Sequence, residues 1–209
     1  MNHLRIKKRN KSFQTFINDE YVGMLYRSDF EKIGIKMKTR DDQDSEELNL
    51  DITDDYLVRI MNVVRDRAFD KAVSYASVSE CCAYDVRLKL QKKEFPEYAI
   101  AETIEMMYEY NYLNDERYAE SYIRCYFQKK SRSLIKKELD MKNIKVDDIE
   151  HILDTVYEDE DMSEDDAIRS LLEKKFKDRD LSDEREKRRA MNLLVRHGFS
   201  FDKINNYLT

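Results

Sequence analysis

The sequence predicts a mainly α-helical protein: a tandem array of three three-helix repeats, elongated and curved, with a small β-hairpin or meander unit at the N-terminus. The first observation behind this prediction is an apolar spacing of 4, 5, 5 and 4 residues that occurs three times. The positions that share it are Val86, Leu90, Phe95, Ile100 and Ile104; Ile135, Leu139, Ile144, Ile149 and Leu153; and Ala190, Leu194, Phe199, Ile204 and Leu208. The second observation is that 209 residues contain three glycines and one proline, which argues against sandwiches, barrels and glycine-lined phosphate loops.

This spacing predicts a helix, a tight turn and a second helix. A step of four residues places two apolar side chains on one helix face, and the two steps of five span a helix end, a buried turn residue and the next helix start. Equivalent positions lie 49 and then 55 residues apart, which leaves room for one more helix upstream of each pair. A single unit of this kind cannot easily bury its own apolar face, so we expect the units to stack on one another.

Residues 1–40 do not belong to the repeat and are predicted to form a strand-rich module. The segments 13–17 and 21–26 are rich in aromatic and β-branched residues, and the intervening residues 18–20 suit a three-residue hairpin loop. Residues 4–6 are a candidate third strand. The module carries ten bases against four acids, and it has no ligand constellation.

A short helix and an acidic segment are expected after the hairpin. Ser28 and Glu31 have the spacing of a capping box, and Gly34 offers a left-handed stop. Residues 41–55 contain eight acids and no bases, and we interpret them as a linker or exposed loop. Thr53 at their end is a candidate N-cap for the helix that follows.

The helical repeats are predicted at 56–112, with a long lead helix, and at 113–160 and 161–209. Capping and stop residues place the helices within them. After the lead helix, which runs toward Ala76, helices are expected at about 79–93 and 96–110 in the first repeat, after Asn114 and at about 131–143 and 147–158 in the second, and after Ser163 (with Asp166), Ser182 and Ser200 in the third.

Charge is divided unevenly along the chain. The net charge is −6, yet 41–55 and 158–166 contribute −15 between them, so the remaining residues sum to +9. One interpretation is an ordinary solvated surface. The other is that basic faces of the folded units meet a polyanion or an acidic protein surface.

Clusters of basic residues in each repeat are the candidate contacts with a partner. They are predicted to line one side of the array, where contacts with phosphates would make binding depend on salt. Because Glu138 and Glu186 lie among them, a solvated helix face is the competing interpretation. The candidates are Lys89, Lys92 and Lys93 in the first repeat, Lys129, Lys130, Arg132, Lys136 and Lys137 in the second, and Arg185, Lys187, Arg188 and Arg189 in the third.

The sequence shows no catalytic constellation, so we expect no enzyme activity, no cofactor and no metal site. The three histidines, His3, His151 and His197, lie far apart and have no partner at ligand spacing. The spacing of the three cysteines fits neither a disulfide framework nor zinc. No apolar run is long enough to span a membrane, and the N-terminus lacks the apolar core of a signal peptide, so a cytoplasmic protein is expected. We further expect a monomer.

One segment, YNYLNDERYAESYIR at 110–124, resembles the best-marked motif of the bacterial RecX regulatory proteins. The similarity also covers 72–95, the segment before Ile135, and the strand-rich N-terminus. The chain departs from the family pattern at 79–82, where the usual arginines are absent, and at Asn111 and Ser131, where glycine is usual. The matching motif residues are Tyr112, Leu113, Asn114, Asp115, Arg117, Tyr118, Ala119, Tyr122, Ile123 and Arg124.

The resemblance implies a modulator of the RecA recombinase that acts in DNA repair, homologous recombination and the SOS response. Such a protein is expected to bind along the groove of the RecA nucleoprotein filament and to limit filament extension, ATP hydrolysis and strand exchange. The motif residues would form mainly a structural joint between repeats. Two alternatives stay open: a helical-repeat protein that binds single- or double-stranded DNA directly, and a helical adaptor for another partner.

Overall fold

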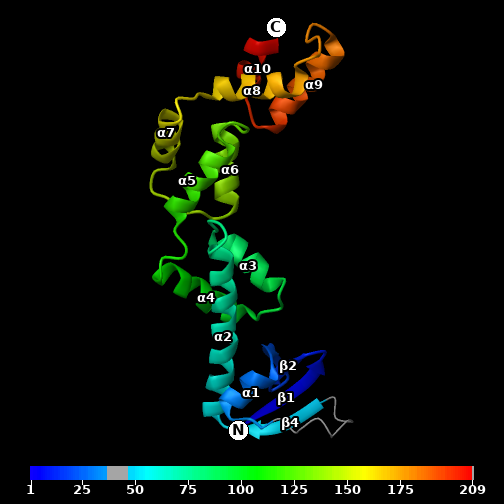
Figure 1. The fold of residues 1–209 in the computed structure, drawn as a ribbon, viewed down its shortest axis with the longest axis vertical. Coiled ribbons are helices and arrows are strands. Elements are labelled where there is room, and N and C mark those ends of the chain that lie inside the picture. The colour runs from blue at the N-terminus through cyan, green and yellow to red at the C-terminus, as the bar shows by residue number, and fades with distance from the viewer. Residues whose placement is uncertain (37–46, 209) are drawn as a thin grey trace. The chain divides into compact units, whose positions relative to one another are not determined.

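The computed structural model describes residues 1–36 and 47–208, and within these ranges it contains ten helices and four strands (Figure 1). The chain divides into two compact units, Met1–Leu113 and Asn114–Thr209. The predicted fold class, mainly helical with three-helix repeats and a small N-terminal sheet, is confirmed.

The N-terminal sheet is antiparallel, with strand order β3-β2-β1-β4. Its strands are β1 (Asn2–Arg9), β2 (Ser12–Ile17), β3 (Glu20–Leu25) and β4 (Glu47–Ile52). The predicted hairpin is present as β2 and β3, but its loop has two residues instead of three. Asn18 and Asp19 both adopt left-handed conformations, with φ of 50° and 67°, which is the pattern of a type I′ turn.

Strand β4 corrects the interpretation of the acidic segment 41–55. The first part, 41–46, lies outside the described residues, but 47–52 pairs with β1 along its whole length. Leu48 packs against the core and Ile52 is buried, so apolar and polar residues alternate here as in a strand with one covered face. The eight acids of 41–55 led to the prediction of a linker or loop, although 48, 50 and 52 are apolar.

Helix α1 (Arg27–Ile33) begins earlier than the proposed capping box at Ser28 and Glu31 requires. The N-cap is Tyr26 instead of Ser28, and the carboxylate of Asp29, three residues later, accepts the backbone N–H of Tyr26 at 2.7 Å. The predicted stop is confirmed, since Gly34 has φ of 93°. Asp29 is therefore a buried helix-start residue, and it also forms an ion pair with Arg67.

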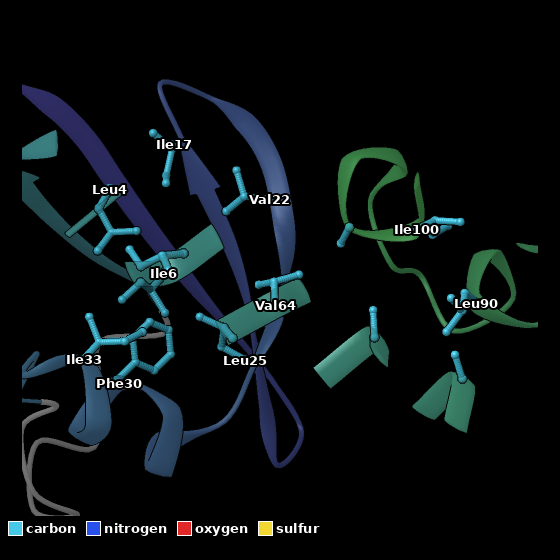
Figure 2. Packing of buried hydrophobic residues seen from close by; sticks show 14 of the residues in the cluster. Leu4, Ile6, Ile17, Val22, Leu25, Phe30, Ile33, Val64, Leu90 and Ile100 are labelled. Atoms are coloured by element: carbon cyan, nitrogen blue, oxygen red, sulfur yellow. The ribbon is translucent and has the colours of Figure 1, made fainter. Parts of the chain in front are cut away.

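The sheet and the first repeat share one core. Figure 2 shows Leu4, Ile6 and Leu25 of the sheet beside Phe30 of α1 and Val64 of α2 (Asp54–Ala76). The same cluster of buried residues continues along α2 to α3 (Ala83–Gln91) and α4 (Glu97–Glu109). Because the 23-residue helix α2 contacts both the sheet and α4, the strand module and the first repeat form a single packed unit.

The start of α3 differs from the prediction, which placed it at about residue 79. Cys82 is the extended N-cap residue, with φ of −111° and ψ of 167°, so the helix begins at Ala83. The Cys82 thiol donates to the carboxylate of Asp85 at 3.3 Å. The segment 79–82, where the usual arginines of the resembled family are absent, therefore precedes α3 and contains two buried thiols, Cys81 and Cys82.

The second unit consists of six helices in the described residues. The side chains of Asn114 and Ser163 cap helices as predicted, and the Ser163 hydroxyl lowers the pKa of Asp166 by donating to its carboxylate. The last two helices begin just after Asp183 and Ser200. The six are α5 (Asp115–Tyr126), α6 (Arg132–Met141), α7 (Ile149–Asp159), α8 (Glu164–Phe176), α9 (Glu184–Arg196) and α10 (Phe201–Leu208).

The predicted repeat is visible in the backbone of the turns. At the same repeat position, Glu94, Asn143 and Gly198 adopt left-handed conformations with φ of 60°, 56° and 85°. In each turn the following apolar residue donates its N–H to a carbonyl five residues back, always at 3.2 Å, as in a Schellman-type helix end. The donor and acceptor pairs are Phe95 and Leu90, Ile144 and Leu139, and Phe199 and Leu194.

Candidate partner-binding surfaces

The twelve predicted basic candidates differ in their surroundings, and some are neutralised within their own unit. The ammonium group of Lys130 lies 2.6 Å from the Glu138 carboxylate and 3.7 Å from the ring centroid of Tyr126, and its side chain is 19% exposed. Arg132 and Lys136 of α6 form ion pairs with Asp154 and Glu150 of α7. These three cations of the second repeat therefore stabilise contacts inside the protein.

In the first and third repeats, too, some candidates contact other residues of the protein and others are exposed. The Lys89 ammonium lies 4.9 Å from the ring centroid of Tyr75, and Arg189 forms an ion pair with Glu186 one turn earlier. Lys187 is half-buried. The remaining six are exposed and, among the residues that the structure describes, have no carboxylate partner: Lys92, Lys93, Lys129, Lys137, Arg185 and Arg188.

The motif that resembles the RecX family consists largely of buried or internally bonded residues. Leu113, Tyr118 and Ala119 are at most 7% exposed. The Asp115 carboxylate accepts the backbone N–H of Lys145 at 2.8 Å and so connects the start of α5 to the loop before α7. Tyr112 is 41% exposed and its ring contacts Phe69 edge-on.

Arg124 links α5 to the end of α7. Its guanidinium bonds to Asp159 at 2.8 Å, to Glu160 at 2.9 Å and to Glu120 at 3.0 Å. The three carboxylates, Asp159 first, raise the pKa of Arg124. Since Nε, Nη1 and Nη2 all donate to carboxylates of the second unit, Arg124 positions helices in this structure. Arg117 is half-buried and its backbone N–H is capped by Asn114.

The second and third repeats are joined by polar contacts around Ser131, which is 3% exposed. Its hydroxyl donates to the Gly198 carbonyl at 2.7 Å and accepts the N–H of Leu134 at 3.1 Å, while its own N–H donates to the His197 carbonyl at 2.9 Å. A glycine, which is usual here in the resembled family, would lack the hydroxyl. This serine therefore caps α6 and holds the preceding turn against the end of α9.

We predict that Ser131→Ala lowers the free energy of unfolding of the second unit by about 2 kcal/mol, because it removes both the N-cap of α6 and the hydroxyl that donates to the half-buried Gly198 carbonyl. Urea denaturation of the full chain measures the change. Ser163→Ala is the matched control, since it removes an exposed cap without a contact between repeats, and a loss of about 1 kcal/mol is expected. Equal losses for the two variants would contradict the role of Ser131 in joining the repeats.

The structure also contains a basic groove that the sequence analysis missed. It has a volume of about 670 Å³ and lies between the end of α8 and α9. Lys175 lies in the last turn of α8 and Arg179 in the turn after it, while Arg189 and Arg196 are seven residues apart on one face of α9. Of these four cations only Arg189 is among the predicted candidates, because the set is brought together by the packing of α8 against α9.

Metal ligands, membrane-spanning helices and reactive thiols are further features that bear on function. No group of histidine, cysteine and carboxylate side chains at 1–36 and 47–208 could hold a metal ion. Over the same ranges no helix combines the length and the apolar character that crossing a membrane requires. Cys81, Cys82 and Cys125 are free thiols, and burial raises the pKa of Cys81.

Comparison with known families identifies two matching domains. Residues 114–153 match the model for the second three-helix domain of RecX, and residues 163–208 match that for its third three-helix domain. Both matches begin at observed helix starts, at Asn114 and at Ser163.

Similar proteins and structures agree with these matches. The regulatory protein RecX of Bacillus velezensis is 30% identical over 201 residues, which span 95% of this chain and 72% of that protein. The regulatory protein RecX of Caldanaerobacter subterraneus subsp. tengcongensis is 28% identical over 207 residues, or 98% of this chain and 96% of that one. A crystal structure of regulatory protein RecX covers 98% of both chains with a TM-score of 0.53 at 16% identity, which shows a shared fold.

Proposed function

The chain belongs to the RecX family of regulatory proteins, and on this premise we propose that it modulates the RecA recombinase, in the inhibitory direction. It would bind along the groove of the RecA nucleoprotein filament in the cytoplasm as a monomer, limiting filament extension, ATP hydrolysis and strand exchange. The observation that carries the proposal, besides family membership, is the threefold recurrence of one helix-turn-helix geometry.

A repeated unit suits a partner that presents its sites in a row. Each repeat that engages a recombinase subunit places the next repeat at high effective concentration near the next subunit, so weak individual contacts add up to strong binding. The same argument explains why no single deep pocket is needed. The function assigned here is therefore distributed over the surface of several repeats.

The six exposed cations that have no carboxylate partner among the described residues are the ones proposed to make contact. Lys129 and Lys137 belong to the second repeat, and Arg185 and Arg188 to the third. Such charges speed association and fix orientation on an acidic surface without the cost of breaking an existing ion pair. The internally paired cations, such as Arg132 and Lys136, would contribute less, since each would first have to leave its carboxylate.

Direct DNA binding is the second candidate function, and the same free cations favour it because they are able to neutralise phosphates. The two functions differ in what binding requires. Recognition of the filament predicts that retention on single-stranded DNA depends on RecA. Direct binding predicts a salt-sensitive complex with naked DNA. Sedimentation and gel-shift measurements on the same DNA with and without RecA distinguish them.

We predict that the double variant Lys129→Glu/Lys137→Glu needs about tenfold more protein to inhibit RecA-driven strand exchange. Two surface contacts at roughly 0.5 to 1 kcal/mol each, with added repulsion, amount to about 1.4 kcal/mol. The assay titrates each protein against a fixed amount of RecA and DNA.

The matched control is Lys174→Glu/Lys177→Glu, which makes the same charge change at exposed lysines of the same unit that are outside the candidate set. The control is expected to stay within about twofold of the unmodified protein. Equal potency of the Lys129→Glu/Lys137→Glu protein and the unmodified protein would reject these contacts. Loss of DNA retention that is independent of RecA would favour direct DNA binding instead.

A further inference from the structure

The groove between α8 and α9 combines positive charge with an apolar floor. Four basic side chains line it: Lys175 and Arg179 from α8 and the turn after it, and Arg189 and Arg196 from α9. None of the described residues that line the groove is acidic. Placing four cations together costs electrostatic free energy, so the arrangement favours an anionic occupant.

One carboxylate beside the groove holds part of the rim in place. Glu186, which is 15% exposed, accepts a bond from Arg179 at 2.7 Å and also pairs with Arg189. Hydrogen bonding from Arg179 lowers the pKa of Glu186, which therefore stays ionised in neutral solution. Arg179 and Arg189 share this one carboxylate, and Lys175 and Arg196 have no ion-pair partner in the described part of the chain, so the four cations keep a positive excess.

The floor of the groove is apolar. Phe176, Leu193 and Val195 line it, and Val195 is 39% exposed. The guanidinium carbon of Arg179 lies 5.7 Å from the Phe176 ring centroid, so a cation stands directly at the edge of the apolar surface. An apolar side chain seated on this floor would have cations within reach on both sides.

We propose that this groove binds an acidic amphipathic peptide segment of a partner protein. An apolar side chain of the segment would contact Leu193 and Val195, and neighbouring carboxylates would pair with Lys175 and Arg196. A nucleic acid fits less well, because the floor is mainly aliphatic and the guanidinium of Arg179 already lies over the Phe176 ring, whereas nucleic-acid grooves present open aromatic faces for stacking. The residues that carry this proposal, Lys175 and Arg196, are outside the set proposed to contact RecA.

The test measures fluorescence anisotropy of labelled probes with the full-length protein. One probe is a glutamate-rich synthetic peptide with one leucine and one phenylalanine, and the second has both apolar residues replaced by serine. The third is a single-stranded oligonucleotide. We expect the apolar acidic peptide to bind about tenfold or more tightly than the serine peptide, since it buries at least one large apolar side chain.

Three variants locate the binding on the protein. Lys175→Glu/Arg196→Glu is expected to weaken binding of the apolar peptide about tenfold or more, and Val195→Ser to remove most of its advantage over the serine peptide. Lys174→Glu/Lys177→Glu is the control, since these lysines are close to the groove residues in sequence but do not line the groove. It is expected to change binding by less than about twofold. Circular dichroism verifies that each variant is folded.

Three results would overturn the proposal. One is equal affinity for the two peptides, which would mean that charge alone is recognised. Another is tighter binding of the oligonucleotide that the Lys175→Glu/Arg196→Glu change abolishes, which would make the groove a nucleic-acid site. The last is equal weakening by the control variant. Because strand exchange is not part of this test, the groove and the proposed inhibition of RecA fail or succeed separately.

Discussion

Gly198→Ala is expected to destabilise the second unit by about 3 kcal/mol, with roughly 1 kcal/mol from the left-handed backbone and the rest from overpacking. Gly198 has φ of 85°, which disfavours any residue with a Cβ. The added Cβ would also lie 2.5 Å from both the Cβ of Leu134 and the hydroxyl oxygen of Ser131. Neither neighbour moves easily, since one is fixed to the backbone of α6 and the other is its N-cap.

Hydrogen exchange of the full-length protein, followed by mass spectrometry on peptides from α6 and α9, measures this loss. The matched control is Asn143→Ala at the equivalent repeat position, where φ is 56° and a Cβ is already present. Its expected cost is about 1 kcal/mol or less, because only the tolerance of asparagine for this conformation is lost. If both variants lost equal protection from exchange, the close packing of Gly198 against Ser131 and Leu134 would not contribute to stability.

Asp29→Ala is expected to destabilise the first unit by about 3 kcal/mol, since it breaks a largely buried ion pair and removes a helix cap. The carboxylate is 4% exposed and accepts two bonds from Arg67, at 2.9 and 3.1 Å, besides the N–H of Tyr26. The Arg67 guanidinium also lies 4.3 Å from the ring centroid of Tyr26. Removing Asp29 thus leaves a half-buried cation of α2 without its partner.

Urea titration monitored by amide exchange in α1 and α2 measures the effect of Asp29→Ala. Asp66→Ala is the control, because Asp66 pairs with Arg65 at 2.7 Å but is 61% exposed, and a cost below about 0.5 kcal/mol is expected. A double-mutant cycle with Arg67→Met isolates the pair, and its coupling should exceed about 1 kcal/mol. A coupling near zero would show that the stability comes from the cap alone.

Local patterns predicted most of the fold. The recurring apolar spacing located the paired helices and their turns, and Leu90, Leu139 and Leu194 are all buried at equivalent positions. Caps such as Asn114 and Ser163 were predicted because their bonds reach only three residues along the chain. These features depend on neighbours in sequence, so one sequence is sufficient to infer them.

Features that depend on distant partners were missed. Strand β4 is stabilised by β1, about 45 residues earlier. Without that pairing, the acidic residues of β4 favour a linker over a strand. The hairpin loop is a different case, because its turn is local: three residues were predicted, whereas Asn18 and Asp19 make the turn alone and Glu20 belongs to β3. The groove was missed because its cations come from α8, the turn after it and α9, which only packing brings together.

The sequence by itself determined where the cations of this protein are, which helices carry them and how often the helical unit recurs. Only the tertiary structure decided which of them are available to a partner. Lys136 and Lys137 are neighbours in the chain, yet the first is paired with Glu150 and the second is exposed without a carboxylate partner among the described residues. The physical reason is that helical periodicity is set by bonds three to four residues apart, whereas an ion pair exists only where packing brings two separate helices within a few ångströms.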